Sequence, residues 1–181
     1  MSNRTKRSVL RTGALLLIVG AGMWALAGDG RGLDGMKKLV RTRFPSVQQL
    51  STQELSAWLK DGRKPQPAVL DVRTQAEFDV SHLPGARRVD PEAKAADVVP
   101  MLEKGRPVVT YCSVGYRSSA MADRLRKAGL AQVSNLEGSI FQWANEGRPL
   151  QTNGKPATKV HPYNATFGKM LDEQRRAEVR D

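Results

Sequence analysis

The sequence predicts one α/β domain, built on a parallel central sheet of about five strands with helices on both faces. Continuous apolar runs at 68–72 and 107–111 have the composition of strands that are covered on both sides. A segment with helix signals follows each run, and such alternation is typical of parallel sheets. At 181 residues the chain is long enough for one well-buried domain with tails, and too short for two full domains.

Two capping boxes define the first expected helices. Ser51 and Glu54 predict a helix over 52–60, and Thr74 and Glu77 begin a second helix after the strand at 68–72. The remaining expected elements are a short strand at 87–90, a short helix at 98–102, a helix after the loop at 112–117 that stops at Gly129, a strand at 133–136 and a helix at 138–145.

The single cysteine, Cys112, stands at the C-terminal end of the strand at 107–111, and a short loop with Gly115 leads from it to Arg117. Ligands of parallel sheets bind beyond the carboxyl ends of the strands. A thiolate is the nucleophilic form of cysteine, and its pKa falls beside a helix N-terminus and a guanidinium. A tight loop also directs several backbone N–H groups toward one point, as an anion cradle does. We therefore interpret Cys112 as a reactive thiol rather than a buried core cysteine.

The spacing Cys-x-x-x-x-Arg-Ser that begins at Cys112 resembles the active-site loop of the rhodanese family of sulfurtransferases, with Gly115 in the usual place. Other segments that resemble the family follow in the family's order. They are Asp71-Val72-Arg73 with Glu77-Phe78, Ser81-His82-Leu83-Pro84-Gly85-Ala86, Leu136-Glu137-Gly138, and Trp143 through Gly147 to Pro149. Together they cover about 46–150, the length of one domain. Ser81 and Ser139 stand where the family commonly has glycine.

The resemblance implies a rhodanese-like fold and sulfur transfer through a Cys112 persulfide, from a donor such as thiosulfate or a persulfide to a thiol or cyanide. We expect Arg117 to hold the loop and to stabilise negative charge on the sulfur. The other loop residues contribute chiefly backbone N–H groups; they are Ser113, Val114, Gly115 and Tyr116. The expected supporting residues are Asp71, Arg73 and Ser118, although the first two could equally form only a salt-bridged strand end.

Two other function classes stay open. A cysteine phosphatase or arsenate reductase of related fold needs a cradle one residue larger and commonly has histidine before the cysteine, whereas Tyr111 precedes Cys112 here. A non-catalytic binding module would use the same fold to present a surface to a partner. Because Arg117 is the loop's only cation, efficient binding of thiosulfate is doubtful and a protein or low-molecular-weight persulfide is a competing donor. No cofactor is expected, and His82 and His161, the latter a tail residue, offer no metal site.

The basic charge of the chain is concentrated near its N-terminus. Residues 1–43 carry nine Lys or Arg against two Asp, a surplus of seven within the net charge of +11. This distribution favours a membrane surface as partner and argues against nucleic acid. Four basic residues precede an uncharged segment at 12–28, which would span about 25 Å as a helix. We expect 1–28 to be a cleaved signal peptide or an uncleaved anchor, with the domain in the cell envelope, in the periplasm.

Two further segments flank the domain expected at 46–150. The basic linker at 29–45 places Leu33, Met36, Val40 and Phe44 at helical spacing, so it is either an amphipathic helix on anionic lipid or a solvated linker. The polar tail at 151–181 is expected to pack loosely on the domain, with a charged stretch at 164–180 that could be helical.

Overall fold

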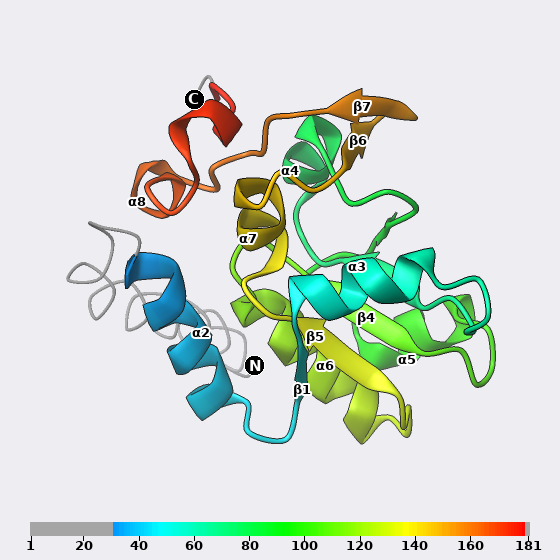
Figure 1. Ribbon diagram of the computed structural model, residues 1–181. Coiled ribbons are helices and arrows are strands. Elements are labelled where there is room, and N and C mark those ends of the chain that lie inside the picture. The colour runs from blue at the N-terminus through cyan, green and yellow to red at the C-terminus, as the bar shows by residue number, and fades with distance from the viewer. Residues whose placement is uncertain (1–30, 180–181) are drawn as a thin grey trace, which may run out of the picture.

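A five-stranded parallel sheet forms the centre of the computed structural model, which describes residues 31–179 (Figure 1). The strand order is β1-β5-β4-β2-β3, and every neighbouring pair is parallel. The strands are β1 (Gln48–Leu50), β2 (Ala68–Asp71), β3 (Arg87–Arg88), β4 (Val108–Tyr111) and β5 (Val133–Leu136). This arrangement confirms the predicted fold class and places β4, with Cys112 after it, in the middle of the sheet.

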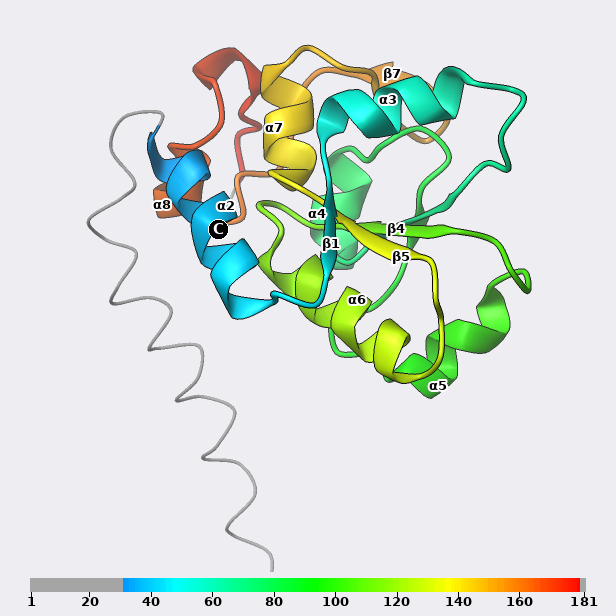
Figure 2. The same cartoon turned by 60° about the horizontal axis from the view of Figure 1, so that its bottom comes forward.

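Helices cover both faces of the sheet (Figure 2). On one face lie α3 (Thr52–Lys60) and α7 (Ser139–Asn145), and on the other lie α5 (Ala95–Val98) and α6 (Tyr116–Lys127). The other helical segments of the central part are α4 (Gln75–Val80) and η1 (Val99–Met101). Val69 and Val109 belong to one buried cluster, while Leu70 and Val108 belong to the other. Because both faces are covered, the strands read as continuous apolar runs.

Both predicted capping boxes are present. The Ser51 hydroxyl accepts from the Glu54 N–H at 3.1 Å, and the Glu54 carboxylate accepts from the Ser51 N–H at 2.8 Å. The Thr74 hydroxyl likewise accepts from the Glu77 N–H at 3.3 Å. These bonds satisfy N–H groups that a helix leaves unpaired at its start, so α3 begins at Thr52 as predicted.

The segment 29–45 is not a linker from Arg31 onward, because α2 (Arg31–Arg43) packs on the domain. Met36 and Val40 are each only 2% exposed, and Met36 belongs to the same buried cluster as the core of the domain. The apolar face therefore lies against the protein's own core and is not available to lipid, which makes the lipid-bound alternative wrong for this face. Arg41 also binds the helix to the loop after β5, because its Nη2 donates to Glu137 Oε2 at 2.7 Å.

The segment expected to be a loosely packed tail is part of the core. Strands β6 (Leu150–Thr152) and β7 (Lys155–Ala157) form an antiparallel hairpin, followed by α8 (Ala165–Gly168) and η2 (Glu173–Arg175). Val160, Met170 and Leu171 are 0%, 7% and 2% exposed, within the same buried cluster as Met36. The stretch 164–179 forms no long helix, only the short segments α8 and η2.

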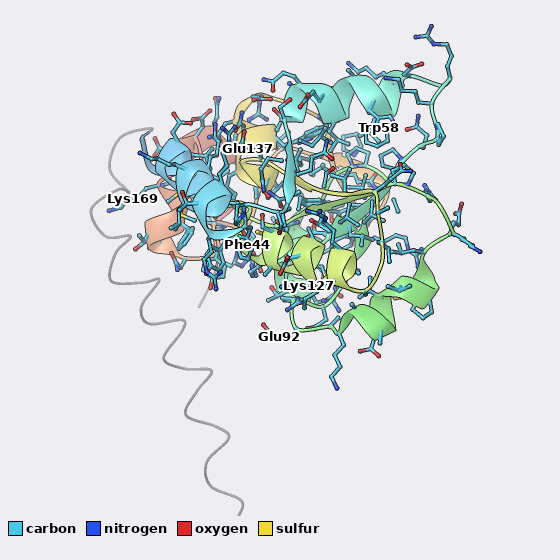
Figure 3. All side chains as sticks on the ribbon, turned by 90° about the horizontal axis from the view of Figure 1, so that it is seen from below. Phe44, Trp58, Glu92, Lys127, Glu137 and Lys169 are labelled. Carbon is cyan, nitrogen blue, oxygen red and sulfur yellow. The ribbon has the colours of Figure 1, made fainter. Side chains whose placement is uncertain are left out.

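The two flanking elements meet: α2 and α8 lie side by side in both views (Figures 1 and 2). Figure 3 shows Phe44 at the end of α2 that faces α6, and its ring packs edge-on against Tyr116 with centroids 5.3 Å apart.

Residues 1–30 lie outside the described part, and so does the expected signal peptide or anchor. Among the helices from Arg31 to Val179, none has the length and apolar character needed to span a membrane.

Candidate active site

Cys112 directly follows β4, and only 1% of it is exposed. The chain turns at once, so that the N–H of Gly115 donates to Cys112 Sγ at 3.2 Å. Gly115 has φ of +104°, and a Cβ at this position would lie 3.3 Å from Asn135 Nδ2. Both the left-handed backbone and the close neighbour require glycine. The tight loop predicted from the sequence is therefore formed around the sulfur.

Helix α7 holds the backbone of the loop. The N–H groups of Ile140 and Phe141 donate to the carbonyls of Cys112 and Ser113, at 3.2 and 3.1 Å. They belong to the first turn of α7, where N–H groups have no partner within the helix. The loop thus supplies the acceptors that the helix N-terminus needs, and its position is fixed by main-chain contacts.

Ser139 also binds the loop, a role that the sequence did not reveal. Its hydroxyl accepts from the Cys112 N–H at 3.2 Å and donates to the Leu136 carbonyl at 3.0 Å. The residue has φ of +51°, a conformation that residues with a Cβ rarely adopt. Serine thus stands at a position where glycine would be unstrained, and its hydroxyl compensates by binding the backbone of Cys112.

Arg117 lies against Glu77 of α4. Nη1 donates to Oε2 at 2.8 Å and Nη2 donates to Oε1 at 2.7 Å, which makes a bidentate ion pair. The Ser113 hydroxyl joins them, donating to Glu77 Oε1 at 2.9 Å and accepting from Arg117 Nη2 at 2.9 Å. Arg117 therefore links the loop to α4, and both of its Nη atoms donate within this cluster.

Glu77 is the main site residue that sequence reasoning missed. Its capping box with Thr74 explains why a glutamate stands at the start of α4. That role is present, but it is not the only one. The carboxylate is only 2% exposed, far more buried than a helix cap requires. The available signal was position: the helix follows β2, whose carboxyl end lies at the same edge of the sheet as that of β4.

The pKa of the Cys112 thiol lies below its ordinary value. Burial alone would raise it, but the charge of Arg117 and hydrogen bonds from the backbone N–H groups of Ser118 and Gly115 outweigh burial. Burial likewise would raise the pKa of Glu77, whereas the hydrogen bonds and charge of Arg117 bring it down to about 2. The carboxylate and the guanidinium are thus both charged at neutral pH, and the site favours a thiolate.

Asp71 and Arg73, two of the three expected supporting residues, lie one layer further out. Asp71 and Arg73 form an ion pair with both side chains 0% exposed, and Nη2 lies 2.7 Å from Oδ2. Arg73 also donates to the Ser81 carbonyl at 2.6 Å. The pair therefore fixes the turn from β2 into α4, which carries Glu77, rather than contacting the sulfur. The Ser118 hydroxyl donates to Asn135 Oδ1 at 2.6 Å and ties α6 to β5.

The two histidines differ in their relation to the site. His82 stacks on Phe78 with ring centroids 3.8 Å apart, and its Nδ1 lies 3.1 Å from the Phe78 carbonyl oxygen, so it shapes the turn. His161 was expected to be a plain tail residue, but it is partly buried near the ion pair. Burial lowers its pKa, and the charges of Glu77, Arg73 and Arg117 all act on it. Within residues 31–179 no three His, Cys, Asp or Glu side chains form a metal site.

Comparison with known proteins gives a match between residues 51–146 and the rhodanese-like domain. The chain is 33% identical over 101 residues to the probable adenylyltransferase/sulfurtransferase MoeZ of Mycobacterium tuberculosis, covering 55% of this chain and 25% of that protein. It is 32% identical over 108 residues to a sulfurtransferase of Allochromatium vinosum, covering 58% of this chain and 94% of that protein. The chain therefore spans only a quarter of the first relative and nearly all of the second.

The structure of a rhodanese-like domain protein from Staphylococcus aureus superimposes with a TM-score of 0.52 at 26% identity, covering 60% of this chain and all of that one. The sheet, the cysteine loop after its central strand and the family match together define the class of protein as rhodanese-like. The chain belongs to the rhodanese-like domain family, and its relatives include sulfurtransferases. Both α2 and most of the segment after Asn145 lie outside the matched residues.

Proposed function

We propose that this protein is a sulfurtransferase that carries a sulfane sulfur as a persulfide on Cys112. The observation that carries the proposal is the closed loop, in which the Gly115 N–H donates to Cys112 Sγ at 3.2 Å. A thiol with a lowered pKa is a better nucleophile at neutral pH, and N–H groups directed at the sulfur stabilise the anionic persulfide. The family match and the sulfurtransferase relatives support the same reaction.

The reaction has two half-reactions and no net redox change. The Cys112 thiolate attacks the outer sulfur of a donor, a new S–S bond forms, and the donor remnant leaves with the electron pair as sulfite or as a thiolate. An acceptor thiolate or cyanide then attacks the outer sulfur of the Cys112 persulfide, and Cys112 leaves as the thiolate. Because the enzyme alternates between two covalent states, ping-pong kinetics are expected.

For the donor, we propose a low-molecular-weight or protein persulfide in preference to thiosulfate. Thiosulfate is a dianion, and Arg117 is the loop's only cation. Both Nη atoms of Arg117 donate to Glu77, whose charge compensates that of the guanidinium. A second anion would therefore meet little net positive charge, whereas a persulfide brings at most one negative charge to the sulfur.

Intact mass spectrometry tests the reaction directly. The protein is incubated separately with thiosulfate and with a glutathione persulfide, and each sample is examined for one added sulfur atom. We expect an adduct from the persulfide, a slower one from thiosulfate, and none from either donor in the Cys112→Ser variant. Because Cys112 is the single cysteine, the adduct is assigned without mapping.

A protein that acquires no sulfur from either donor would contradict the proposal. The near-complete burial of Cys112, at 1% exposed, is the observation that would then favour a binding module. Hydrolysis of an aryl phosphate without persulfide formation would instead favour the phosphatase class. Turnover with cyanide or a thiol acceptor completes the test, and its double-reciprocal plots should be parallel.

We further propose that the domain is exported and stays at the cell envelope, in the periplasm. The proposal depends on sequence alone, because four basic residues precede the uncharged segment at 12–28. A reporter fused after Val179 that is active only in the cytoplasm would contradict it. N-terminal sequencing of the mature protein separates the signal peptide from the anchor, since cleavage predicts a start at Gly28.

A further inference from the structure

The C-terminal segment contacts one of the two faces of the Arg117 guanidinium, whereas Glu77 and Ser113 bind its edge. Those two residues occupy the edge of the guanidinium with hydrogen bonds of 2.7 to 2.9 Å. The ring of Tyr163 lies over the guanidinium, with Arg117 Cζ 4.9 Å from the ring centroid. A cation within about 6 Å of an aromatic face is attracted by the ring quadrupole. Tyr163 therefore contacts the residue that holds the Cys112 loop.

The backbone of Tyr163 shows that this placement is imposed by its surroundings. Its φ is +66°, a left-handed conformation that is strained for a bulky residue. Two local contacts maintain it: the Tyr163 N–H donates to His161 Nδ1 at 3.0 Å, and the ring packs edge-on against Phe167 with centroids 5.2 Å apart. The side chain stays partly open to solvent, at 42% exposed, so burial of the ring alone does not account for the strain.

Several contacts fix the segment before and after Tyr163 to the domain. The Ser81 hydroxyl donates to the Lys159 carbonyl at 2.6 Å. The Val160 N–H donates to the Arg175 carbonyl at 2.7 Å, and Val160 itself is 0% exposed. After α8, Asn145 Nδ2 donates to the Met170 carbonyl at 2.9 Å. The Tyr163 ring is thus held over Arg117 by a segment anchored on both sides.

We propose that Tyr163 is a positioning residue of the sulfur-transfer site, which holds the Arg117 guanidinium toward the Cys112 loop from outside the rhodanese-like domain. The inference deepens the proposed function and rests on it for the identity of the reaction. The ring attracts the guanidinium and keeps water from one of its faces, so the charge acts on Cys112 with less screening. The groups that face Arg117 are Glu77, Ser113, His161, Tyr163 and the sulfur.

The test measures the thiol pKa of Cys112 from the pH dependence of its alkylation by iodoacetamide in the full-length protein. Tyr163→Leu keeps an apolar side chain without the ring, and Tyr163→Asn removes the ring while tolerating the left-handed backbone. Both should raise the thiol pKa and lower the alkylation rate about two- to fivefold below that pKa. Tyr163→Phe keeps the ring and should restore wild-type values. If the Asn variant does not fold, the Leu variant decides.

Phe167→Leu is the matched control, because it alters the same segment at a residue that packs on Tyr163 but does not cover Arg117. It should shift the thiol pKa less than Tyr163→Leu does, because the Tyr163 ring over Arg117 and the bond from the Tyr163 N–H to His161 both remain. A folded Tyr163→Leu variant with the wild-type thiol pKa would overturn the proposal, and so would an equal shift in Phe167→Leu, which would assign the effect to loosening of the segment. Alkylation needs no sulfur donor, so a wild-type protein that never forms a persulfide would contradict the proposed function and leave this test valid.

Discussion

Arg117 and Glu77 form a bidentate ion pair that joins the cysteine loop to α4, with N···O distances of 2.8 and 2.7 Å across 40 residues of sequence. The pair explains three properties of the site together. It fixes the loop, it keeps a guanidinium near the sulfur, and it leaves that guanidinium with a compensating charge.

Stability should fall in acid because of Glu77. Its pKa is lowered from an ordinary 4.5 to about 2; burial opposes this shift, and the hydrogen bonds and charge of Arg117 cause it. A carboxyl whose pKa is lowered by folding stabilises the protein above its unfolded pKa, and this stabilisation is lost as the pH falls through the folded value. The contribution is therefore complete above pH 4.5, amounts to about 3 kcal/mol, and disappears progressively toward about pH 2. Urea denaturation at pH 6 and pH 3 should show about 2 kcal/mol of this loss in the wild type and not in Glu77→Gln, because pH 3 still lies above the folded pKa.

Glu77→Gln should reduce the free energy of unfolding by about 2 to 4 kcal/mol at neutral pH, since it leaves a partly buried guanidinium without its counter-charge. Glu54→Gln is the matched control, because Glu54 occupies the same position of the other capping box and pairs with no arginine there. The free energy of unfolding should fall much less in Glu54→Gln than in Glu77→Gln. Equal losses in the two variants would show that the cap, and not the ion pair, is what Glu77 provides.

The same variant should change the donor preference. With Glu77 neutral, the charge of Arg117 is no longer compensated, so the ratio of kcat/KM for thiosulfate to that for a persulfide should rise relative to wild type. The ratio is the proper measurement, because general damage to the loop lowers both values. A ratio that stays constant would contradict the view that Glu77 disfavours the dianion.

Gly115→Ala should destabilise the protein by about 2 to 3 kcal/mol and abolish most persulfide formation, since a Cβ is strained at φ of +104° and would lie 3.3 Å from Asn135 Nδ2. Gly105→Ala controls for backbone strain alone, because Gly105 has φ of +77° and open space around it. That control should cost about 1 kcal/mol and leave the reaction intact. Similar effects on sulfur uptake from both variants would argue against a special role of the loop glycine.

Met36→Ala should cost about 2 to 4 kcal/mol of stability, as expected of a buried side chain that leaves a cavity. Leu39→Ala lies on the same helix at 37% exposed, against 2% for Met36, and should change stability little. Thermal and chemical unfolding of the two variants compare the faces of α2. If neither variant is destabilised, α2 does not contribute to the domain core.

Local pattern alone determined much of this protein. The capping boxes of Ser51 and Thr74 predicted where α3 and α4 begin, because the hydrogen bonds of a helix start involve residues three apart. The apolar runs predicted β2 and β4, and the spacing after β4 predicted a tight loop at Cys112. The edge strand β1 was missed, since three residues give too short an alternation to recognise.

Tertiary structure decided what surrounds Cys112. The periodicity of Met36 and Val40 marked an apolar face, but periodicity does not say whether that face meets a lipid or the protein's own core. Glu77, Ser139 and Tyr163 contact Arg117 or Cys112 across 27 to 46 positions of sequence, from elements that the sheet places beside the loop. Strand order and packing set such proximity. Sequence patterns predict contacts only between residues that are a few positions apart, as in a helix cap.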